Sequence, residues 1–169
     1  TVLPSGDLTG RTDADNIQTA LESVAPGGNV LLEAGEFFTS RPIAVKGFNG
    51  ELRGYGIDAT SIEAVKTSQG NQEPTFESIR VRWYDDLSRK AQRRHTMFYF
   101  EDPVVSLTVS DLTLQVIDWY PVWRCEFCWG GLDALILVTM AEDVDTRFDK
   151  VRLQGGFESG QGNVKWGIR

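Results

Sequence analysis

The stretch IQTALESVAPGGNVLLEAGEFF, residues 17–38, changes its hydrophobic periodicity in the middle. Ahead of the Gly-Gly pair, the apolar residues follow the spacing of one helix face: Ile17, Ala20, Leu21 and Val24. Behind that pair, valine, leucine and phenylalanine residues come in short runs that another glycine interrupts. The stretch therefore predicts one amphipathic helix followed by short strands.

The predicted helix occupies residues 13–25, with its regular part from Asp15 to Val24. Thr12 or Asp13 is the expected N-cap, because a hydroxyl or carboxylate oxygen accepts the unpaired amides of the first helical turn. Pro26 and the glycines after it end the helix, since proline cannot continue it and glycine tolerates a left-handed turn. With one apolar and one polar face, the helix is expected to cover an apolar surface.

Short apolar runs and turn residues alternate through the rest of the chain, and 17 glycines supply the corners. The expected strands are Val30–Leu32, Phe37–Phe38, Ile43–Val45, Glu51–Arg53, Ser61–Val65, Met97–Phe100, Val104–Val109, Leu112–Val116, Leu135–Thr139, Phe148–Leu153 and Asn163–Ile168. An antiparallel sandwich or a parallel solenoid fits such strands. Asn49-Gly50 is the single Asn-Gly hairpin signal, so the pattern favours the solenoid, with the helix as a cap on its first coil.

Bulk composition places the chain among ordinary globular proteins. It has 169 residues, of which 41% are hydrophobic and 24% charged, and we expect one domain over residues 1–169. A net charge of -7 argues against nucleic-acid binding driven by phosphate neutralisation. The longest apolar run, near Ala134 to Val138, is far shorter than the roughly 20 residues of a membrane span.

Residues 13–65 resemble the N-terminal coils of right-handed parallel β-helix proteins of the pectate lyase and pectin lyase-like superfamily, and of phage tailspikes. In that group an IQxAL helix precedes a Gly-Gly turn, a V-x-L strand, a glycine before an aromatic residue, a later strand, L-x-G-x-G and T-x-I. The matching residues are Ile17, Gln18, Ala20, Leu21, Gly27, Gly28, Val30, Leu32, Gly35, Phe37, Ile43, Val45, Leu52, Gly54, Gly56, Thr60 and Ile62. The segments VSDLTLQ, residues 109–115, and FDKVRLQ, residues 148–154, look like later coil strands.

The resemblance implies an all-β fold, a right-handed parallel β-helix of about three to four coils behind a capping helix. Family members usually run to several hundred residues, so we expect a truncated C-terminal end that meets further chain or self-associates. The implied function is that of an extracellular or periplasmic protein acting on polysaccharide, as a lyase or glycoside hydrolase. The alternatives are a non-catalytic carbohydrate-binding, adhesin or tailspike-like module, or a structural cap of a longer solenoid. A lyase of this group would bring calcium, and the resemblance implies no other cofactor.

Two segments depart from the coil rhythm and are expected to be loop insertions. Residues 66–95 carry much of the basic charge, which suits either a solvated face or a contact to acidic polysaccharide. Residues 118–133 gather aromatic side chains, whose rings either stack on sugars or form a small satellite core. The candidate substrate-binding residues are Trp119, Tyr120, Trp123, Arg124 and Trp129.

The acidic run AEDVDTRFD, residues 141–149, holds the candidate catalytic residues Asp143, Asp145 and Arg147. On a strand, alternate residues share a face, so these three would line up, although an exposed turn has the same composition. Cys125 and Cys128 are the only cysteines, and with one histidine they cannot complete a four-ligand Cys/His zinc site, so no metal site is assigned. They are expected to be structural thiols or a local disulfide, with metal or redox chemistry as the remaining alternative.

Overall fold

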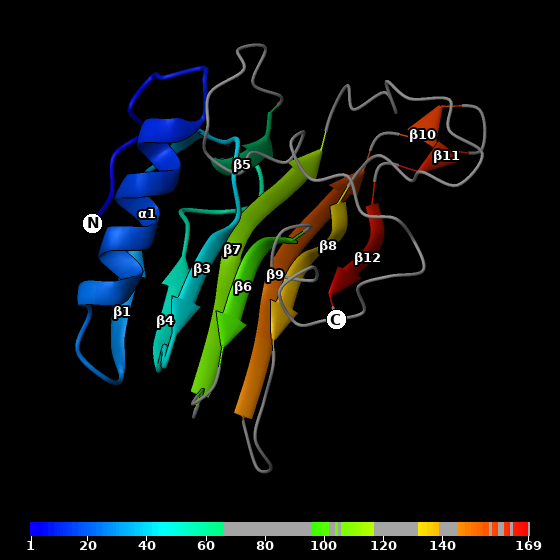
Figure 1. The fold of residues 1–169 in the computed structure, drawn as a ribbon. Helices are drawn as coiled ribbons and strands as arrows, with labels where there is room; N and C mark the ends of the chain where they lie inside the picture. The colour runs from blue at the N-terminus through cyan, green and yellow to red at the C-terminus, as the bar shows by residue number, and fades with distance from the viewer. Residues whose placement is uncertain are drawn as a thin grey trace.

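The computed structural model describes residues 1–65, 96–101, 104, 106–116, 132–138, 145–155, 157–158, 161–162 and 164–168. These residues are mostly strands in parallel sheets, accompanied by the helix α1, Arg11–Ser23 (Figure 1). The strands are β1 Gly28–Leu31, β2 Gly35–Thr39, β3 Ile43–Lys46, β4 Gly50–Arg53, β5 Thr60–Ala64, β6 Thr96–Glu101, β7 Ser106–Val116, β8 Leu132–Val138, β9 Asp145–Gly155, β10 Phe157–Glu158, β11 Gln161–Gly162 and β12 Val164–Ile168. The predicted all-β composition with one short helix is confirmed in this part of the chain.

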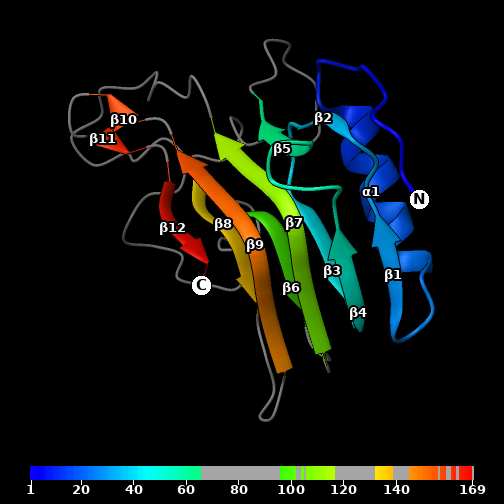
Figure 2. The ribbon, with the colours of Figure 1, turned by 180° about the vertical axis from the view of Figure 1, so that it is seen from behind.

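Two parallel sheets account for most of the described strands (Figure 2). In the larger sheet β1 pairs with β4 and β2 with β5, and both β4 and β5 pair with the long strand β7, which pairs with β9. In the other sheet the order is β3, β6, β8 and β12. The chain visits the two sheets in turn, and each new strand lies beside the strand of the preceding pass. Only the short β10–β11 pair is antiparallel among the described strands.

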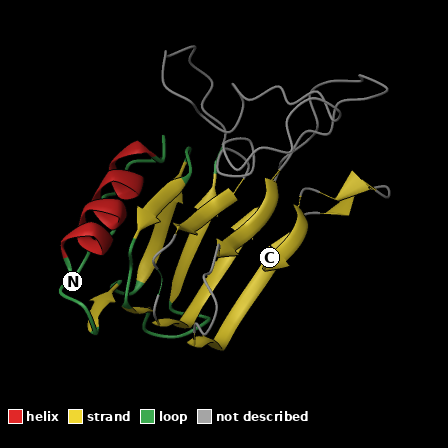
Figure 3. Ribbon diagram, turned by 60° about the horizontal axis from the view of Figure 1, so that its bottom comes forward, coloured by secondary structure: helices red, strands yellow, loops and turns green. Residues whose placement is uncertain are grey.

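Apolar side chains from successive passes form columns inside the larger sheet. Phe37, Ile62 and Leu114 are in register and 0% exposed, and Leu153 continues their column on β9 at 37% exposed. Helix α1 closes the opposite end of the row of strands (Figure 3). The core is therefore sealed beside the helix and more open beside β9.

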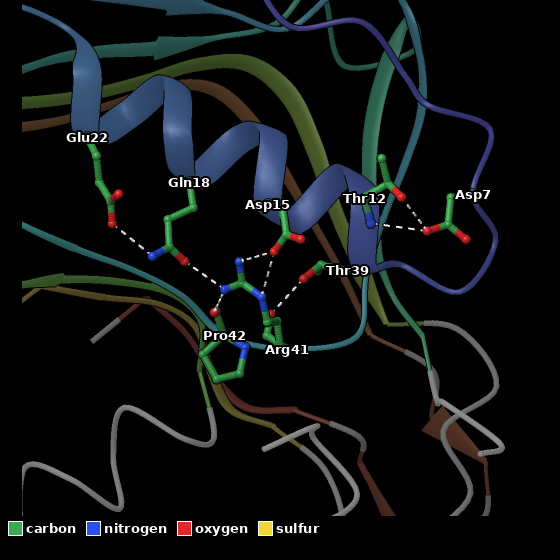
Figure 4. Close-up of polar contacts among 8 residues, drawn as sticks. All are labelled: Asp7, Thr12, Asp15, Gln18, Glu22, Thr39, Arg41 and Pro42. Carbon is green, nitrogen blue, oxygen red and sulfur yellow. Dashed lines mark hydrogen bonds and ion pairs between the residues drawn. The ribbon is translucent and has the colours of Figure 1, made fainter. Parts of the chain in front are cut away.

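Helix α1 begins earlier than the sequence predicts, and its cap is a different residue. Gly10 is the N-cap, in the left-handed conformation with φ 73°, and it provides no side-chain cap. The Asp7 carboxylate instead accepts hydrogen bonds from the Thr12 amide at 3.1 Å and the Thr12 hydroxyl at 2.8 Å (Figure 4). The prediction that Thr12 or Asp13 caps the helix is therefore wrong, because the preceding loop folds back to supply the acceptor.

Replacing Asp7 with alanine is expected to lower the free energy of unfolding by about 1 kcal/mol at neutral pH. The Thr9 side chain, the Thr12 amide and hydroxyl, and the Thr9 amide donate to Asp7 and hold the pKa of its carboxyl well below the usual range. Because the folded-state pKa is the lower one, the stabilisation is complete above the ordinary value of roughly 3.9 and is lost as pH falls toward the folded-state pKa.

Urea unfolding of wild type and Asp7→Ala at neutral pH and at about pH 2.5 measures this dependence. The difference between the two proteins should shrink at the lower pH. Glu36→Ala, at an exposed position on β2, is the control and should change stability little. An Asp7→Ala effect that stays constant between the two pH values would contradict the assignment.

Asp13 lies in the first turn of α1 and joins three segments of the chain. Its side chain is 0% exposed, and its carboxylate accepts the Ser5 amide at 2.8 Å and the Phe38 amide at 2.9 Å. Phe38 belongs to β2, an outermost strand of the larger sheet. The carboxylate therefore occupies the edge of β2 and sits where the helix N-terminus favours negative charge.

Backbone groups of the N-terminal segment cover other positions of the same sheet edge. The Val2 amide donates to the Leu31 carbonyl at 2.8 Å, and the Val2 carbonyl accepts the Glu33 amide at 3.0 Å. The Gly10 carbonyl accepts the Ser40 amide at 3.1 Å. The first edge of the sheet is thus paired with backbone, which limits its pairing with another chain.

Arg41, in the turn between β2 and β3, fastens the polar face of α1 (Figure 4). Its guanidinium donates from Nη2 to Asp15 Oδ1 and from Nη1 to Gln18 Oε1, each at 2.6 Å. Gln18 donates in turn from Nε2 to Glu22 Oε1 at 2.8 Å. One arginine thus fixes the helix from outside while the apolar face packs inward.

Several predicted strand boundaries change in the structure. The expected strands Val104–Val109 and Leu112–Val116 are one strand, β7, which bends at Asp111 instead of breaking. Strand β8 begins at Leu132, so the second expected insertion, residues 118–133, overlaps it at its end. The rest of that insertion and the whole of residues 66–95 lie outside the described residues.

Candidate functional site

Two of the candidate catalytic residues lie on β9. Asp145 is in register with Ser106 and Arg147 with Thr108, and as alternate residues of one strand both face outward and are exposed. Arg147 Nη2 lies 3.6 Å from Asp149 Oδ2, the next outward position of β9. Asp143 lies outside the described residues. The same is true of Trp119, Tyr120, Trp123, Arg124 and Trp129, and of Cys125, Cys128 and His95.

The outer face of the larger sheet continues this polar surface across neighbouring strands. Glu51 on β4 is in register with Thr108, and Thr108 with Arg147. The Ser110 hydroxyl, on β7, donates to Glu51 Oε1 at 2.7 Å. Carboxylate, hydroxyl and guanidinium groups thus lie on successive strands, which are roughly 4.8 Å apart.

The larger sheet bends along a row of charged side chains that the sequence did not single out. Asp111 on β7 and Lys150 on β9 have positive φ values of 54° and 49°, which is uncommon for residues other than glycine. Asp111 Oδ2 lies 3.4 Å from Arg53 Nε, and Asp111 Oδ1 lies 3.7 Å from Lys150 Nζ. The row therefore alternates positive, negative and positive charge over three adjacent strands.

Aligning VSDLTLQ with FDKVRLQ would have predicted which residues of this row lie side by side on β7 and β9. Val109 pairs with Phe148 and Gln115 with Gln154, so the two segments match position by position. That alignment sets Asp111 opposite Lys150. The alignment does not predict the positive φ of either residue, since nothing local in the sequence indicates positive φ for a lysine.

Residues 54–59 form a corner loop at the same bend, between β4 and β5. The Gly54 amide donates to the Ser110 carbonyl at 3.0 Å, and the Gly56 amide to the Asp111 carbonyl at 2.8 Å. The loop is thus fixed to β7, and it carries the exposed side chain of Tyr55. The sequence marks this segment only by the glycines Gly54 and Gly56 of the L-x-G-x-G motif.

Cation–carboxylate contacts dominate the described part of this surface. Within the described ranges, no group of three or more His, Cys, Asp and Glu side chains is placed to hold a metal ion. No helix of the same residues is long and apolar enough to cross a membrane. Chemically, the surface offers hydrogen-bond donors and acceptors to a polar ligand that lies across the strands.

Comparisons with known proteins add no assignment to this geometry. No protein-family model matches the chain, and no curated protein or solved structure is significantly similar to it.

Proposed function

We propose that the chain forms the N-terminal coils of a right-handed parallel β-helix protein, exported from the cell, that acts on polysaccharide. The observation that carries the proposal is the order in which the chain visits its two parallel sheets, with each strand beside that of the preceding pass. Connections between parallel strands of one sheet are almost always right-handed. A helix at the first edge of the strands agrees with the resemblance of residues 13–65.

The side chains on the outer face of the larger sheet are the evidence for choosing a polysaccharide as the ligand. Its polar groups recur at strand spacing, which suits a polymer whose own hydroxyl groups recur along its length. The acidic chain, with net charge -7, disfavours a polyphosphate ligand such as nucleic acid. Fold alone does not define a reaction, so the activity depends on the side chains of this surface and of the expected aromatic insertion.

Catalysis by a lyase or glycoside hydrolase is the first form of this function. Asp145 and Arg147 share one outward face, and Asp143 is two residues earlier in the chain. Replacing Arg147 or Asp143 with alanine is expected to lower turnover at least 100-fold, the usual contribution of a general acid or base. Lys46→Ala, at an exposed position on β3, is the matched control and should retain full turnover.

The measurement is the release of reducing ends, or of unsaturated products that absorb ultraviolet light, from a panel of neutral and acidic polysaccharides. Turnover that survives both substitutions would contradict the catalytic assignment. Retention of a glycan without any product supports the second form, a non-catalytic binding module, in which case Trp119→Ala or Trp123→Ala should abolish retention. A chain that retains and cleaves no glycan contradicts the proposed function in both forms.

A further inference from the structure

We propose that the corner loop, residues 54–59, is a subsite for an uncharged, hydroxyl-rich sugar, with the Tyr55 ring as its platform. This inference rests on the polysaccharide function proposed above and places one sugar contact among the described residues. It involves none of the candidate residues named on β9.

The corner loop is held rigidly, which a binding platform requires. Besides the bonds from Gly54 and Gly56 to β7, the Tyr55 amide donates to the Thr60 hydroxyl at 3.0 Å. The Thr113 hydroxyl donates to the Ile57 carbonyl at 2.6 Å. At its far end, Arg152 Nη1 on β9 lies 2.7 Å from Asp58 Oδ1. From the preceding pass, the Gly35 amide donates to the Ala59 carbonyl at 2.8 Å. Contacts with strands on both sides of the loop therefore fix its shape before any ligand arrives.

Tyr55 is the large apolar side chain that this rigid loop leaves in water. It is 55% exposed, and its hydroxyl lies 3.5 Å from Glu33 Oε1, at the outer limit of a hydrogen bond. A tyrosine ring offers a flat face to the C–H groups of a sugar, while the nearby carboxylate accepts sugar hydroxyls. Aromatic rings in binding sites are used in this way because they lose little conformational entropy on binding.

The charges around the loop decide which class of sugar it fits. The side chains concerned are the cations Arg53, Lys150 and Arg152 and the carboxylates Glu33, Asp58 and Asp111. They are equal in number, and contacts between opposite charges neutralise most of them. The surface thus has no net positive charge for a uronate or sulfate, and the chain as a whole repels polyanions. An uncharged sugar satisfies the same donors and acceptors without this penalty.

The subsite has room for several sugar units. Four adjacent passes of the chain each contribute one side chain at the bend: Glu33, Tyr55, Asp111 and Lys150. At the usual strand spacing, this row extends over roughly 14 Å. A glycan strand that crosses the β-strands along the bend would therefore meet ring, carboxylate and cation in sequence.

The test is binding of the full chain to uncharged hexasaccharides of glucose, mannose and galactose, and to hexagalacturonate, by titration calorimetry. Wild type should bind at least one uncharged hexasaccharide more tightly than hexagalacturonate. Tyr55→Ala should weaken that binding roughly tenfold or more, whereas Tyr55→Phe, which keeps the ring, should stay within about threefold. Leu8→Ala, at a side chain 72% exposed in the N-terminal segment, is the control and should bind like wild type. Equal melting temperatures establish that each variant is folded.

The outcomes separate this inference from the proposed function. Suppose that Tyr55→Ala binds an uncharged hexasaccharide as tightly as wild type, whereas Trp119→Ala does not bind it. This result overturns the subsite and leaves the proposed function standing. Preferential binding of hexagalacturonate likewise overturns the choice of an uncharged sugar. Failure of wild type to bind any glycan overturns both proposals.

Discussion

Replacing Asp13 with alanine should lower the free energy of unfolding by about 3 kcal/mol, or the melting temperature by roughly 6–12 °C. The carboxylate is 0% exposed and accepts the amides of Ser5 and Phe38, so its removal leaves two part-buried hydrogen bonds without an acceptor. It also opens the edge of β2 that the helix otherwise covers. Asp13→Asn keeps one amide oxygen and should lose about half as much stability.

Asp15→Ala is the matched control for Asp13→Ala, since it removes a carboxylate from the same helix at a side chain that is 58% exposed. Its ion pair with Arg41 should contribute about 0.5 kcal/mol, as exposed pairs do. Urea unfolding curves of the three variants give the comparison directly. Equal losses for Asp13→Ala and Asp15→Ala would show that Asp13 does not secure the sheet edge.

Replacing Gly54 with alanine should also cost about 3 kcal/mol, for a steric reason. An added Cβ would lie 2.4 Å from the Asp111 carbonyl oxygen and 2.8 Å from the Thr60 Cβ. The backbone oxygen cannot move aside without breaking the bond that it accepts from the Gly56 amide. Close approach of the corner loop to β7 therefore requires a residue without a side chain at position 54.

Gly6→Ala is the control for Gly54→Ala. Gly6 has φ +75°, but an added Cβ would meet nothing within 4 Å, so only the left-handed backbone costs energy, about 1 kcal/mol. Thermal unfolding of both variants separates crowding from backbone strain. If Gly54→Ala were no worse than Gly6→Ala, the close packing of the loop on β7 would be refuted.

Hydrophobic periodicity predicts much of this fold because inward positions recur in both helix and strands. Ile17 and Leu21 lie buried under α1, and Leu52 and Ile62 fill the interior as the short apolar runs indicate. The match of VSDLTLQ with FDKVRLQ gives the register of β7 and β9. These features follow from side chains that must leave water, whatever their partners.

Side-chain contacts that do not follow helix or strand periodicity escape the same reasoning. Asp7 caps a helix that begins several residues later, and Asp13 serves β2 instead of its own helix end. The bend of β7 depends on a left-handed Asp111, which composition does not reveal. For Asp7 and Asp13, a hydrogen bond formed in the folded chain outweighs the local preference of the residue.

In the candidate site, too, some positions could be predicted from the sequence and others could not. Asp145 and Arg147 could be placed on one face from strand alternation alone. The match of VSDLTLQ with FDKVRLQ sets Asp111 opposite Lys150. Tyr55 could not be placed beside them from sequence, because it comes from another pass of the chain that meets them only at the bend. No dense aromatic or acidic run marks such a surface in the sequence, since each pass contributes only one or two of its side chains.

The covered first edge gives the assembly of this protein a direction. The N-terminal segment, α1 and the first strands leave the ribosome before the later passes, and N-terminal units generally fold first during synthesis. Each later pass then docks on a finished template instead of searching for a distant partner, so misregistered intermediates have little time to accumulate.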